Sequence, residues 1–432
     1  MKELFLIFSQ FFFLFFLFLF PFHFIKKEIT FLNNLNFYDL ICLNILIQFN
    51  IYLILSFFFS DIGLLIYFLF ILSLIFSLYL FFKNKFFYKK NYYLILSILL
   101  FLLIVLCNYF AVANNFKLQW DAVAHWFWKV QNFYQGGALT NFKELPYPFY
   151  PHLGTFLWAN FWNLFNSPYE YLGRFYYSYI YLSAVFSILY SIKSKYFFLI
   201  TCAVSYLIVD TFVLGGYQDF LVFFLITYIA RLFFLLREKS VNIYIFLILF
   251  LINLNLLIWS KQEGIIYSFI LFLVFLLSFK SILRIKIALT FFLLLICFVY
   301  FYLSFLFKDS PLFHEPISNN FERLKNLKIF TDSLILISMH VIKGCIQHVV
   351  IILSIIMWLF LKIIKKESFL KMDFVVIFFI LNIILIYAIF FHTSYSLEGM
   401  LGPVMGRLLL QTSGFYLINF IYFFNLNLKN EK

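Results

Sequence analysis

The chain contains little charge for its length. Only 12% of its 432 residues are Asp, Glu, Lys or Arg, whereas 65% are hydrophobic and 70 are Phe. A water-soluble fold cannot bury so large an apolar fraction, so this composition excludes a soluble globular protein and indicates that lipid surrounds most of the chain.

The sequence also lacks the motifs of several large functional classes. It has no Walker loop, no dinucleotide-binding Gly-rich turn, no Ser nucleophile elbow and no zincin helix, so we do not expect an ATP-driven function within this chain. The formal net charge of +13 does not indicate a nucleic-acid partner, because the Lys and Arg residues occur in short groups between apolar segments. The five cysteines all lie in apolar stretches without Cys-x-x-Cys spacing, and we interpret them as small core residues: Cys42, Cys107, Cys202, Cys297 and Cys345.

Apolar runs of about 17 to 25 residues recur along the whole chain and predict membrane-spanning helices. We therefore expect an all-α fold, a polytopic transmembrane helical bundle of about thirteen helices. The first run resembles a signal peptide, but it is long and no small-residue cleavage site precedes Lys26, so we expect a retained helix. The predicted spans lie near 4–25, 41–59, 62–82, 94–113, 172–191, 196–213, 217–236, 242–259, 264–279, 287–307, 334–361, 373–392 and 406–424.

Positive charge occupies every second connection between these spans. Lys and Arg in short loops mark the cytoplasmic side, because cations translocate poorly. The pattern predicts a multi-pass protein of the inner (plasma) membrane with its N-terminus outside and its C-terminus in the cytoplasm. The cationic groups are Lys26/Lys27, Lys83/Lys85/Lys89/Lys90, Lys193/Lys195, Arg237/Lys239, Lys280/Arg284/Lys286 and Lys362/Lys365/Lys366/Lys371.

The longest predicted outer connection, 114–171, carries two short amphipathic stretches, near 120–134 and 154–165. A Pro- and Tyr-rich break at 145–151 separates them. Helices with many Trp and Tyr residues lie flat at the membrane interface, which is the arrangement we expect here. The outer connection at 308–333 has no recognisable spacing of its charged residues, and we interpret it as a solvated loop.

Asp121, His125 and Trp128 form the first group of candidate functional residues. If this stretch is an α-helix, their positions i, i+4 and i+7 place a carboxylate, an imidazole and an aromatic ring on one face. Such a face could supply a general base and a binding surface. The alternative is that Asp121 caps a helix and that the Trp residues belong to an interfacial belt.

Three further segments place ionisable residues at the outer ends of predicted spans. Asp219 enters a helix end, where it requires a polar cavity or a partner unless it is a helix cap. Lys261 lies with Glu263 in a short turn, where it could bind an anionic head group unless the turn is merely polar. Arg407 begins an apolar helix on the side where topology disfavours cations, so it either meets an anionic group or extends to the interface.

The order of these features resembles that of GT-C-type membrane glycosyltransferases, the group that includes protein mannosyltransferases and aminoarabinose transferases. The resemblance covers about 94–424. The features that carry it are Trp120-Asp121-Ala122 at the start of the large outer loop, the break at Pro146 to Pro151 followed by Leu153 and Trp158, Gly216-Tyr217-Gln218-Asp219, Lys261-Gln262-Glu263-Gly264, and Arg407 with Gln411.

The resemblance implies a GT-C-type fold and the transfer of a sugar from a polyprenyl-phosphate donor to a glycan, lipid or protein acceptor on the extracytoplasmic face. It implies Asp121 as the general base, and as substrate-binding residues His125, Trp128, Asp219, Lys261, Glu263 and Arg407. No cofactor is implied, and no divalent metal is indicated because Asp121 is not part of an Asp-Glu or Asp-x-Asp pair.

The resemblance also divides the chain into three parts. Residues 1–93 are additional N-terminal helices, 94–307 are the core with the large loop 114–171, and 308–432 are a C-terminal loop and helices. Two other functions remain open. A lipid-linked polysaccharide polymerase or ligase also acts at the outer face, whereas a transporter or flippase of lipid-linked sugars is expected to hold its charges near the bilayer midplane, often in two related halves.

Overall fold

The computed structural model describes residues 2–82, 92–114, 117–148, 150–192, 197–208, 213–278, 282–306, 326–364, 373–392 and 396–427. These residues form helices and connecting turns and contain no strand, which confirms the predicted all-α class for this part of the chain. Among the described residues, six helices are long and apolar enough to cross a membrane, as expected for a multi-pass membrane protein: α3 (Phe37–Ser56), α5 (Tyr92–Asn114), α10 (Asp219–Arg237), α11 (Ile243–Ser260), α15 (Leu327–Gln347) and α17 (Phe374–His392). The predicted total of about thirteen spans stays a prediction.

The other helices complete the bundle and its connections. The longer ones are α1 (Lys2–Leu17), α4 (Gly63–Phe82), α8 (Phe175–Leu189), α9 (Phe197–Ile208), α12 (Glu263–Ser278), α13 (Ile282–Leu306), α16 (Val349–Ile364), α18 (Leu397–Ser413) and α19 (Ile418–Asn427). The shorter ones are α2 (Phe22–Ile25), η1 (Thr30–Asn34), η5 (Val213–Gly215) and η6 (Gly414–Leu417).

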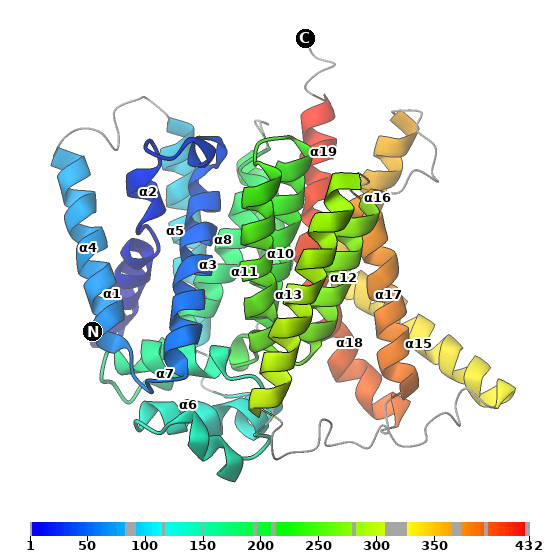
Figure 1. Cartoon of the computed structure of the whole chain (residues 1–432), viewed down its shortest axis with the longest axis horizontal. Helices are drawn as coiled ribbons and strands as arrows, with labels where there is room; N and C mark the ends of the chain where they lie inside the picture. The colour runs from blue at the N-terminus through cyan, green and yellow to red at the C-terminus, as the bar shows by residue number, and fades with distance from the viewer. Residues whose placement is uncertain are drawn as a thin grey trace.

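Most helices run side by side between two ends of the molecule (Figure 1). The N-terminus lies near the end where α6 (Phe127–Tyr134) and α7 (Leu153–Asn163) cross the bundle, here called the loop end, and the C-terminus lies at the opposite end. The centre is formed by α8 and α10, which pack against each other and are almost entirely buried. Helix α3 packs against α8 and α11, so the N-terminal helices contact the central helices directly.

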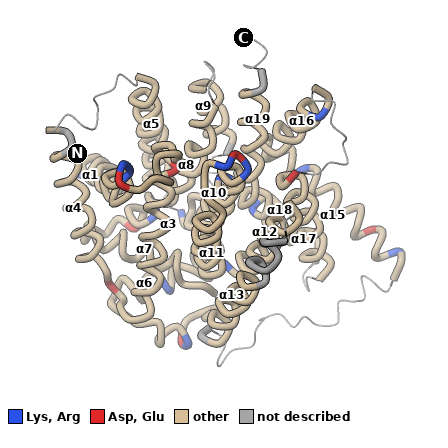
Figure 2. The backbone as a smooth tube through the Cα atoms, turned by 45° about the horizontal axis from the view of Figure 1, so that its top comes forward, with Lys and Arg blue, Asp and Glu red and all other residues tan. Residues whose placement is uncertain are grey.

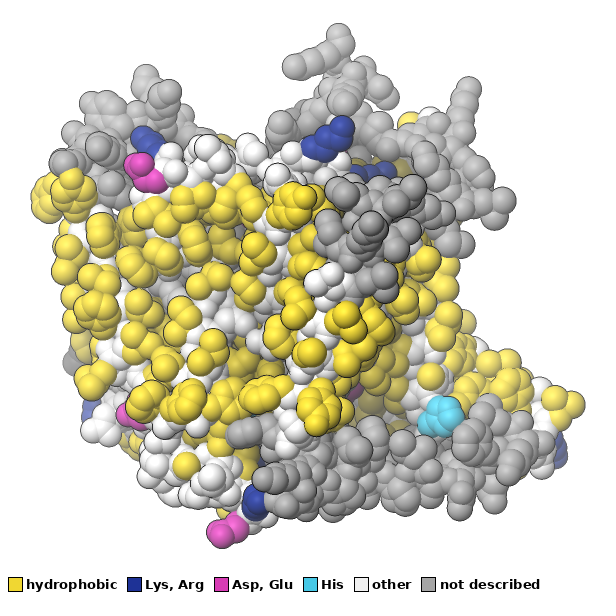
Figure 3. Space-filling view, viewed as in Figure 1, with side chains coloured by type: hydrophobic (Ala, Val, Ile, Leu, Met, Phe, Trp, Pro, Cys, Tyr) yellow, Lys and Arg dark blue, Asp and Glu magenta, His cyan; other side chains and the backbone are white. Residues whose placement is uncertain are grey.

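The lateral surface of the bundle is apolar. A broad band of hydrophobic side chains covers the face seen in Figure 3, and its described charged side chains lie toward the two ends. The backbone view in Figure 2 also shows few charged positions along the middle of the helices. Exposed side chains such as Leu64, Phe58 and Leu199 are costly in water but compatible with lipid, so this band has the character of a membrane-facing surface.

The cationic groups that the structure describes lie near connections at one end. The connection from α2 to α3, the connection from α10 to α11 and the C-terminal end of α16 all lie opposite the loop end in Figure 1. These segments contain Lys26, Lys27, Arg237, Lys239 and Lys362. The side chains of the groups at 83–90, 193–195, 280–286 and 365–371 lie outside the described residues.

The segment predicted as an outer loop is mostly helical. It contains the π-helical turn η2 (Ala122–Trp126), α6 (Phe127–Tyr134), the 3-10 turn η3 (Leu139–Glu144), α7 (Leu153–Asn163) and the 3-10 turn η4 (Glu170–Arg174). Helices are therefore present at both predicted amphipathic stretches. Helix α7 is buried from Leu153 to Trp162 and packs between α6 and the ends of α3, α4 and α11.

Two predicted boundaries differ from the structure. The single helix predicted over 334–361 is wrong, because α15 ends at Gln347 and α16 begins at Val349. His348 between them has φ −95° and ψ 72°, which is not a helical conformation. The predicted solvated loop at 308–333 lies largely outside the described residues, and its last part, from Leu327, is the first part of α15.

Candidate functional site

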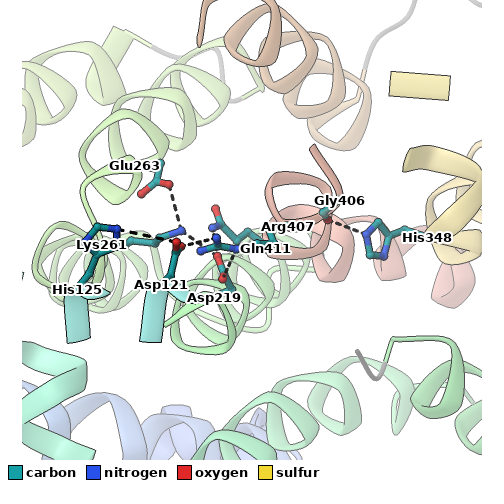
Figure 4. A network of polar contacts seen from close by, with 9 residues as sticks. All are labelled: Asp121, His125, Asp219, Lys261, Glu263, His348, Gly406, Arg407 and Gln411. Atoms are coloured by element: carbon teal, nitrogen blue, oxygen red, sulfur yellow. Dashed lines mark hydrogen bonds and ion pairs between the residues drawn. The ribbon is translucent and has the colours of Figure 1, made fainter. Parts of the chain in front are cut away.

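Ionisable residues from four distant segments meet at the loop end of the bundle (Figure 4). Asp121 precedes η2, Asp219 is the first residue of α10, Lys261 and Glu263 flank the turn from α11 to α12, and Arg407 lies on α18. We refer to a connected set of hydrogen bonds and ion pairs as the polar network; its members are Asp121, Asp219, Lys261, Glu263, Arg407 and Gln411.

Asp219 lies at the centre of the polar network and is 0% exposed. Its Oδ1 accepts a hydrogen bond from Lys261 Nζ at 3.0 Å and another from Gln411 Nε2, and its Oδ2 accepts one from Arg407 Nε at 3.0 Å. A buried carboxylate requires this compensation, because an unpaired buried charge costs several kcal/mol. The helix-cap alternative for Asp219 is wrong, because the cap position of α10 is Gln218 and has no side-chain capping bond.

Arg407 joins the two aspartates. Its Nη1 donates to Asp121 Oδ2 while its Nε donates to Asp219, and the guanidinium carbon lies 3.9 Å from the centre of the Tyr217 ring. A planar guanidinium can bind two carboxylates and stack on an aromatic face at once, which a lysine cannot do. The Arg407 side chain is 11% exposed, so it binds anionic groups inside the protein and does not extend to the interface.

Lys261 joins the buried aspartate to a more accessible carboxylate. Its Nζ lies 3.0 Å from Asp219 Oδ1 and 3.1 Å from Glu263 Oε1. The residue follows the last turn of α11 in an extended conformation, with φ −160° and ψ 156°, and α12 begins two residues later. The segment is therefore more than a polar turn, because it directs a buried ammonium group toward two carboxylates.

The carboxylates of the polar network differ in exposure. The side chains of Asp121 and Glu263 are 20% and 27% exposed, whereas that of Asp219 is buried. Asp121 makes no side-chain capping bond to η2, so the cap alternative fails here as well. With His125 neutral, the polar network holds three carboxylates against two cations and has a formal charge of −1. The partly exposed carboxylates are therefore the accessible ones of the polar network.

The turn before α10 holds Asp219 beside Asp121. Gln119 N donates to Gly215 O at 3.0 Å, which aligns the segment before η2 with this turn. Arg174 pairs with Glu170 at 2.6 Å and donates to Leu214 O at 2.6 Å. Gly216 has φ +102°, and a Cβ there would lie 2.8 Å from Ala122 and Trp158 atoms, so this position requires glycine.

His125 lies beside the polar network within an aromatic enclosure. Its Nε2 is 3.9 Å from Asp121 Oδ1, and its ring stacks on Tyr150 and meets Tyr147 edge-on at a centroid distance of 4.0 Å. Burial lowers the pKa of His125, although the Asp121 carboxylate opposes this effect. Trp128 does not join the site: it is 47% exposed, and the π-helical turn η2 changes the spacing on which the predicted common face depended.

Lys129 has a structural role that the sequence did not indicate. The residue is fully buried, and its Nζ donates to the carbonyl oxygens of Tyr147 and Tyr150, both at 2.8 Å. It lies near the rings of Trp126, Phe142 and Tyr150. Burial lowers the pKa of Lys129 well below its usual value. Lys129 thus holds the Tyr147 to Tyr150 turn against α6, which places both tyrosines around His125.

His348 holds the helix that carries Arg407. Its Nε2 donates to Gly406 O at 2.7 Å, and Figure 4 shows this contact on the side of α18 away from the aspartates. Helices α15 and α18 pack closely there, since a Cβ at Gly406 would lie 3.3 Å from Gln347. The break between α15 and α16 therefore supports the backbone position next to Arg407.

The described residues contain no group of three or more His, Cys, Asp or Glu side chains placed to hold a metal ion. Comparisons of the chain with protein-family models, with curated proteins and with solved structures find no match.

Proposed function

We propose that this protein is a GT-C-type membrane glycosyltransferase that transfers a sugar from a polyprenyl-phosphate donor to an acceptor at the loop end of the bundle. The observation that carries the proposal is the meeting of Asp121, Asp219, Lys261, Glu263 and Arg407 at one end of an apolar bundle. The loop end is the extracytoplasmic side in this proposal, and the bundle crosses the plasma membrane about thirteen times.

The proposed step is a substitution at the anomeric carbon of the donor sugar. The acceptor hydroxyl oxygen forms a bond to this carbon, and the bond from the carbon to the phosphate oxygen breaks. The electron pair of the broken bond stays on the phosphate oxygen, so polyprenyl phosphate leaves. The hydroxyl proton passes to the carboxylate of Asp121, the general base. The products are the glycosylated acceptor and polyprenyl phosphate.

The cations of the polar network are suited to the leaving group. Charge develops on the phosphate oxygen as the sugar departs, and fixed donors in a site shielded from water stabilise such charge strongly. Lys261 and Arg407 are held next to each other by Asp219, so their N–H groups need no rearrangement of helices to reach one anion. We assign the donor phosphate to Lys261 and Arg407.

The position of the polar network also bears on the alternatives. It lies at the ends of α10 and α11, at the loop end, whereas a transporter is expected to hold its charged site midway along its helices. A lipid-linked donor reaches such an end laterally from the membrane, which fits a transferase. No observation favours a polymerase or ligase over a single-sugar transferase.

The experiment that tests the proposal combines genetics with reconstitution. In a strain that lacks the gene, we expect the surface glycans or lipids to lose one sugar in mass and linkage analysis. In proteoliposomes supplied with polyprenyl-phosphate sugar and the acceptor found this way, Asp121→Asn is expected to lower the transfer rate by about two to four powers of ten.

The matched control is Asp332→Asn on the exposed surface of α15, away from the polar network, which should transfer at the normal rate. Near-normal turnover by Asp121→Asn would remove this residue as the base. An unchanged glycan and lipid profile in the deletion strain would contradict the proposed function itself.

A further inference from the structure

Each cation of the polar network is shared between one buried and one accessible carboxylate. Lys261 lies between Asp219 and Glu263, and Arg407 lies between Asp219 and Asp121 (Figure 4). Asp219 is 0% exposed, whereas Asp121 and Glu263 are partly exposed. On its accessible side, each cation is therefore neutralised by the Asp121 or the Glu263 carboxylate. Water can hydrate these two carboxylates when they move away from the cations.

We infer that a phosphate group displaces Asp121 from Arg407 and Glu263 from Lys261, so that donor binding releases the general base. This inference rests on the proposed function, because it concerns the donor of the same reaction. It adds a binding order, in which the donor binds before the acceptor can be deprotonated. In the absence of donor, Glu263 occupies the phosphate site through its ion pair with Lys261.

Asp219 is the carboxylate that stays in place. It accepts hydrogen bonds from three side chains, those of Lys261, Arg407 and Gln411. Displacing it would leave a buried charge without partners, which is strongly unfavourable. Lys261 and Arg407 donate to the two oxygens of the same Asp219 carboxylate, so the two cations lie close together, and each also contacts one accessible carboxylate. A phosphate can accept charge-assisted hydrogen bonds from both cations at once.

The displacement explains how Asp121 can act as a base. Without donor, Asp121 Oδ2 accepts a hydrogen bond from Arg407 Nη1, so this oxygen is occupied. When a phosphate takes over Arg407, the same oxygen can accept the hydrogen bond of the acceptor hydroxyl. The polar network without donor therefore keeps the base occupied, and the donor itself releases it.

Displacement of Asp121 and direct binding of the donor by Asp121, with or without a metal ion, change donor affinity in opposite directions when the charge of Asp121 is removed. If Asp121 competes with the phosphate for Arg407, removing its charge must tighten donor binding. If Asp121 contacts the donor or a bridging metal, removing its charge must weaken donor binding. The sign of one affinity change therefore decides between the two arrangements.

The test measures binding of a polyprenyl monophosphate to the full-length protein in nanodiscs of uncharged lipid, with a chelator present. We expect Asp121→Asn and Glu263→Gln each to tighten binding by up to about fivefold relative to the wild type, the scale of one partly exposed ion pair. Arg407→Ala should weaken binding, and the exposed Asp332→Asn should leave it unchanged. Glu263→Gln changes a partly exposed residue at the start of α12, so it provides a second test if Asp121→Asn does not fold.

The outcomes separate the inference from the proposed function. One contrary result is that the wild type binds polyprenyl phosphate while neither Asp121→Asn nor Glu263→Gln binds it more tightly, and another is that both bind it more weakly. Either result overturns the displacement but leaves a donor site in place. No binding of polyprenyl phosphate to the wild type or to either variant overturns the proposed function as well. A parallel titration with phosphatidic acid distinguishes a polyprenyl carrier from any lipid phosphate: equal tightening for both lipids supports displacement but contradicts selection of the carrier.

Discussion

Arg231 on α10 forms a two-pronged ion pair with Asp39 on α3, with Nε 2.8 Å from Oδ1 and Nη2 2.8 Å from Oδ2. Both residues are buried. Asp39 also completes a capping box at the start of α3, because its carboxylate accepts from Asn36 N while the Asn36 side chain accepts from Asp39 N. The Asp39 carboxylate thus caps the first turn of α3 and joins this helix to α10 at the centre of the bundle.

We predict that breaking this pair destabilises the protein far more than replacing it. Asp39→Ala or Arg231→Met alone leaves one buried charge without its partner and should cost about 3–5 kcal/mol. The double variant removes both charges and should regain much of this loss. Thermal unfolding of the purified protein in detergent measures the effect, with Asp332→Asn as the surface control. Single variants as stable as the wild type would show that the pair contributes little.

The second prediction concerns His152, which is buried at the start of α7 beside Ser56 on α3. Ser56 Oγ donates to Leu53 O at 2.6 Å, so the 2.7 Å contact with His152 requires His152 Nε2 to donate to Ser56 Oγ. A second proton would have to enter on Nδ1, which has no hydrogen-bond partner among the described residues. Burial lowers the pKa of His152 to about 3.

This shift makes stability depend on pH. Between about pH 6.5 and 3 the unfolded chain binds a proton at His152 that the folded chain excludes, so stability is present above pH 6.5 and falls as the pH is lowered. From pH 7 to 5 the loss should reach about 2 kcal/mol. Melting temperatures of the wild type and of His152→Gln over this range measure it. Equal pH dependence in the two proteins would contradict the prediction.

The third prediction concerns sidedness, which the positions of Lys and Arg predict. Thr140 is exposed in η3 at the loop end, and Lys239 is exposed in the connection from α10 to α11 at the opposite end. Thr140→Cys should react with an impermeant maleimide from outside the cell, whereas Lys239→Cys should react only after the membrane is opened. The wild type gives the background of its native cysteines. Labelling of position 140 only from the cytoplasmic side would reverse the topology.

The charged members of the polar network could be selected from the sequence for a simple reason. Asp219, Lys261 and Arg407 interrupt apolar runs, and a charge in such a run requires a partner or a polar surrounding. What the sequence could not give was which charge meets which. Arg407 and Asp121 are 286 positions apart. They meet because α18 packs against α10 and because Gln119 N, near Asp121, donates to Gly215 O in the turn before α10.

Two further features of the fold have a signal in the sequence. Arg231 lies inside the predicted span 217–236, where an ionisable residue indicates a buried partner, and this partner is Asp39. The predicted helix 334–361 is longer than a bilayer requires, which indicates a break, and the break occurs at His348. Lys129 carried no such signal, because its partners are backbone carbonyls that any sequence supplies.

The last prediction concerns Lys129, which we identify as a positioning residue for the proposed reaction. In either protonation state its Nζ has the two N–H groups that bind Tyr147 O and Tyr150 O. Lys129→Met keeps the length and apolar stem but removes both of these hydrogen bonds, while Tyr147 O keeps the one that it accepts from Tyr150 N. Each lost bond should cost about 1 kcal/mol. The Tyr147 to Tyr150 turn should then move away from α6.

This movement should affect catalysis more than donor binding. Tyr147 and Tyr150 enclose His125, which lies beside Asp121, whereas Lys261 and Arg407 are held by Asp219. At saturating donor, Lys129→Met should therefore lower kcat or raise the KM for acceptor by about tenfold while polyprenyl phosphate binds normally. Lys129→Arg, which keeps N–H donors, should restore most of the rate. Lys129→Met could instead show wild-type kcat and KM per folded molecule and only a lower melting temperature. Lys129 would then stabilise the fold without positioning the site, because the enclosure around His125 would not depend on it.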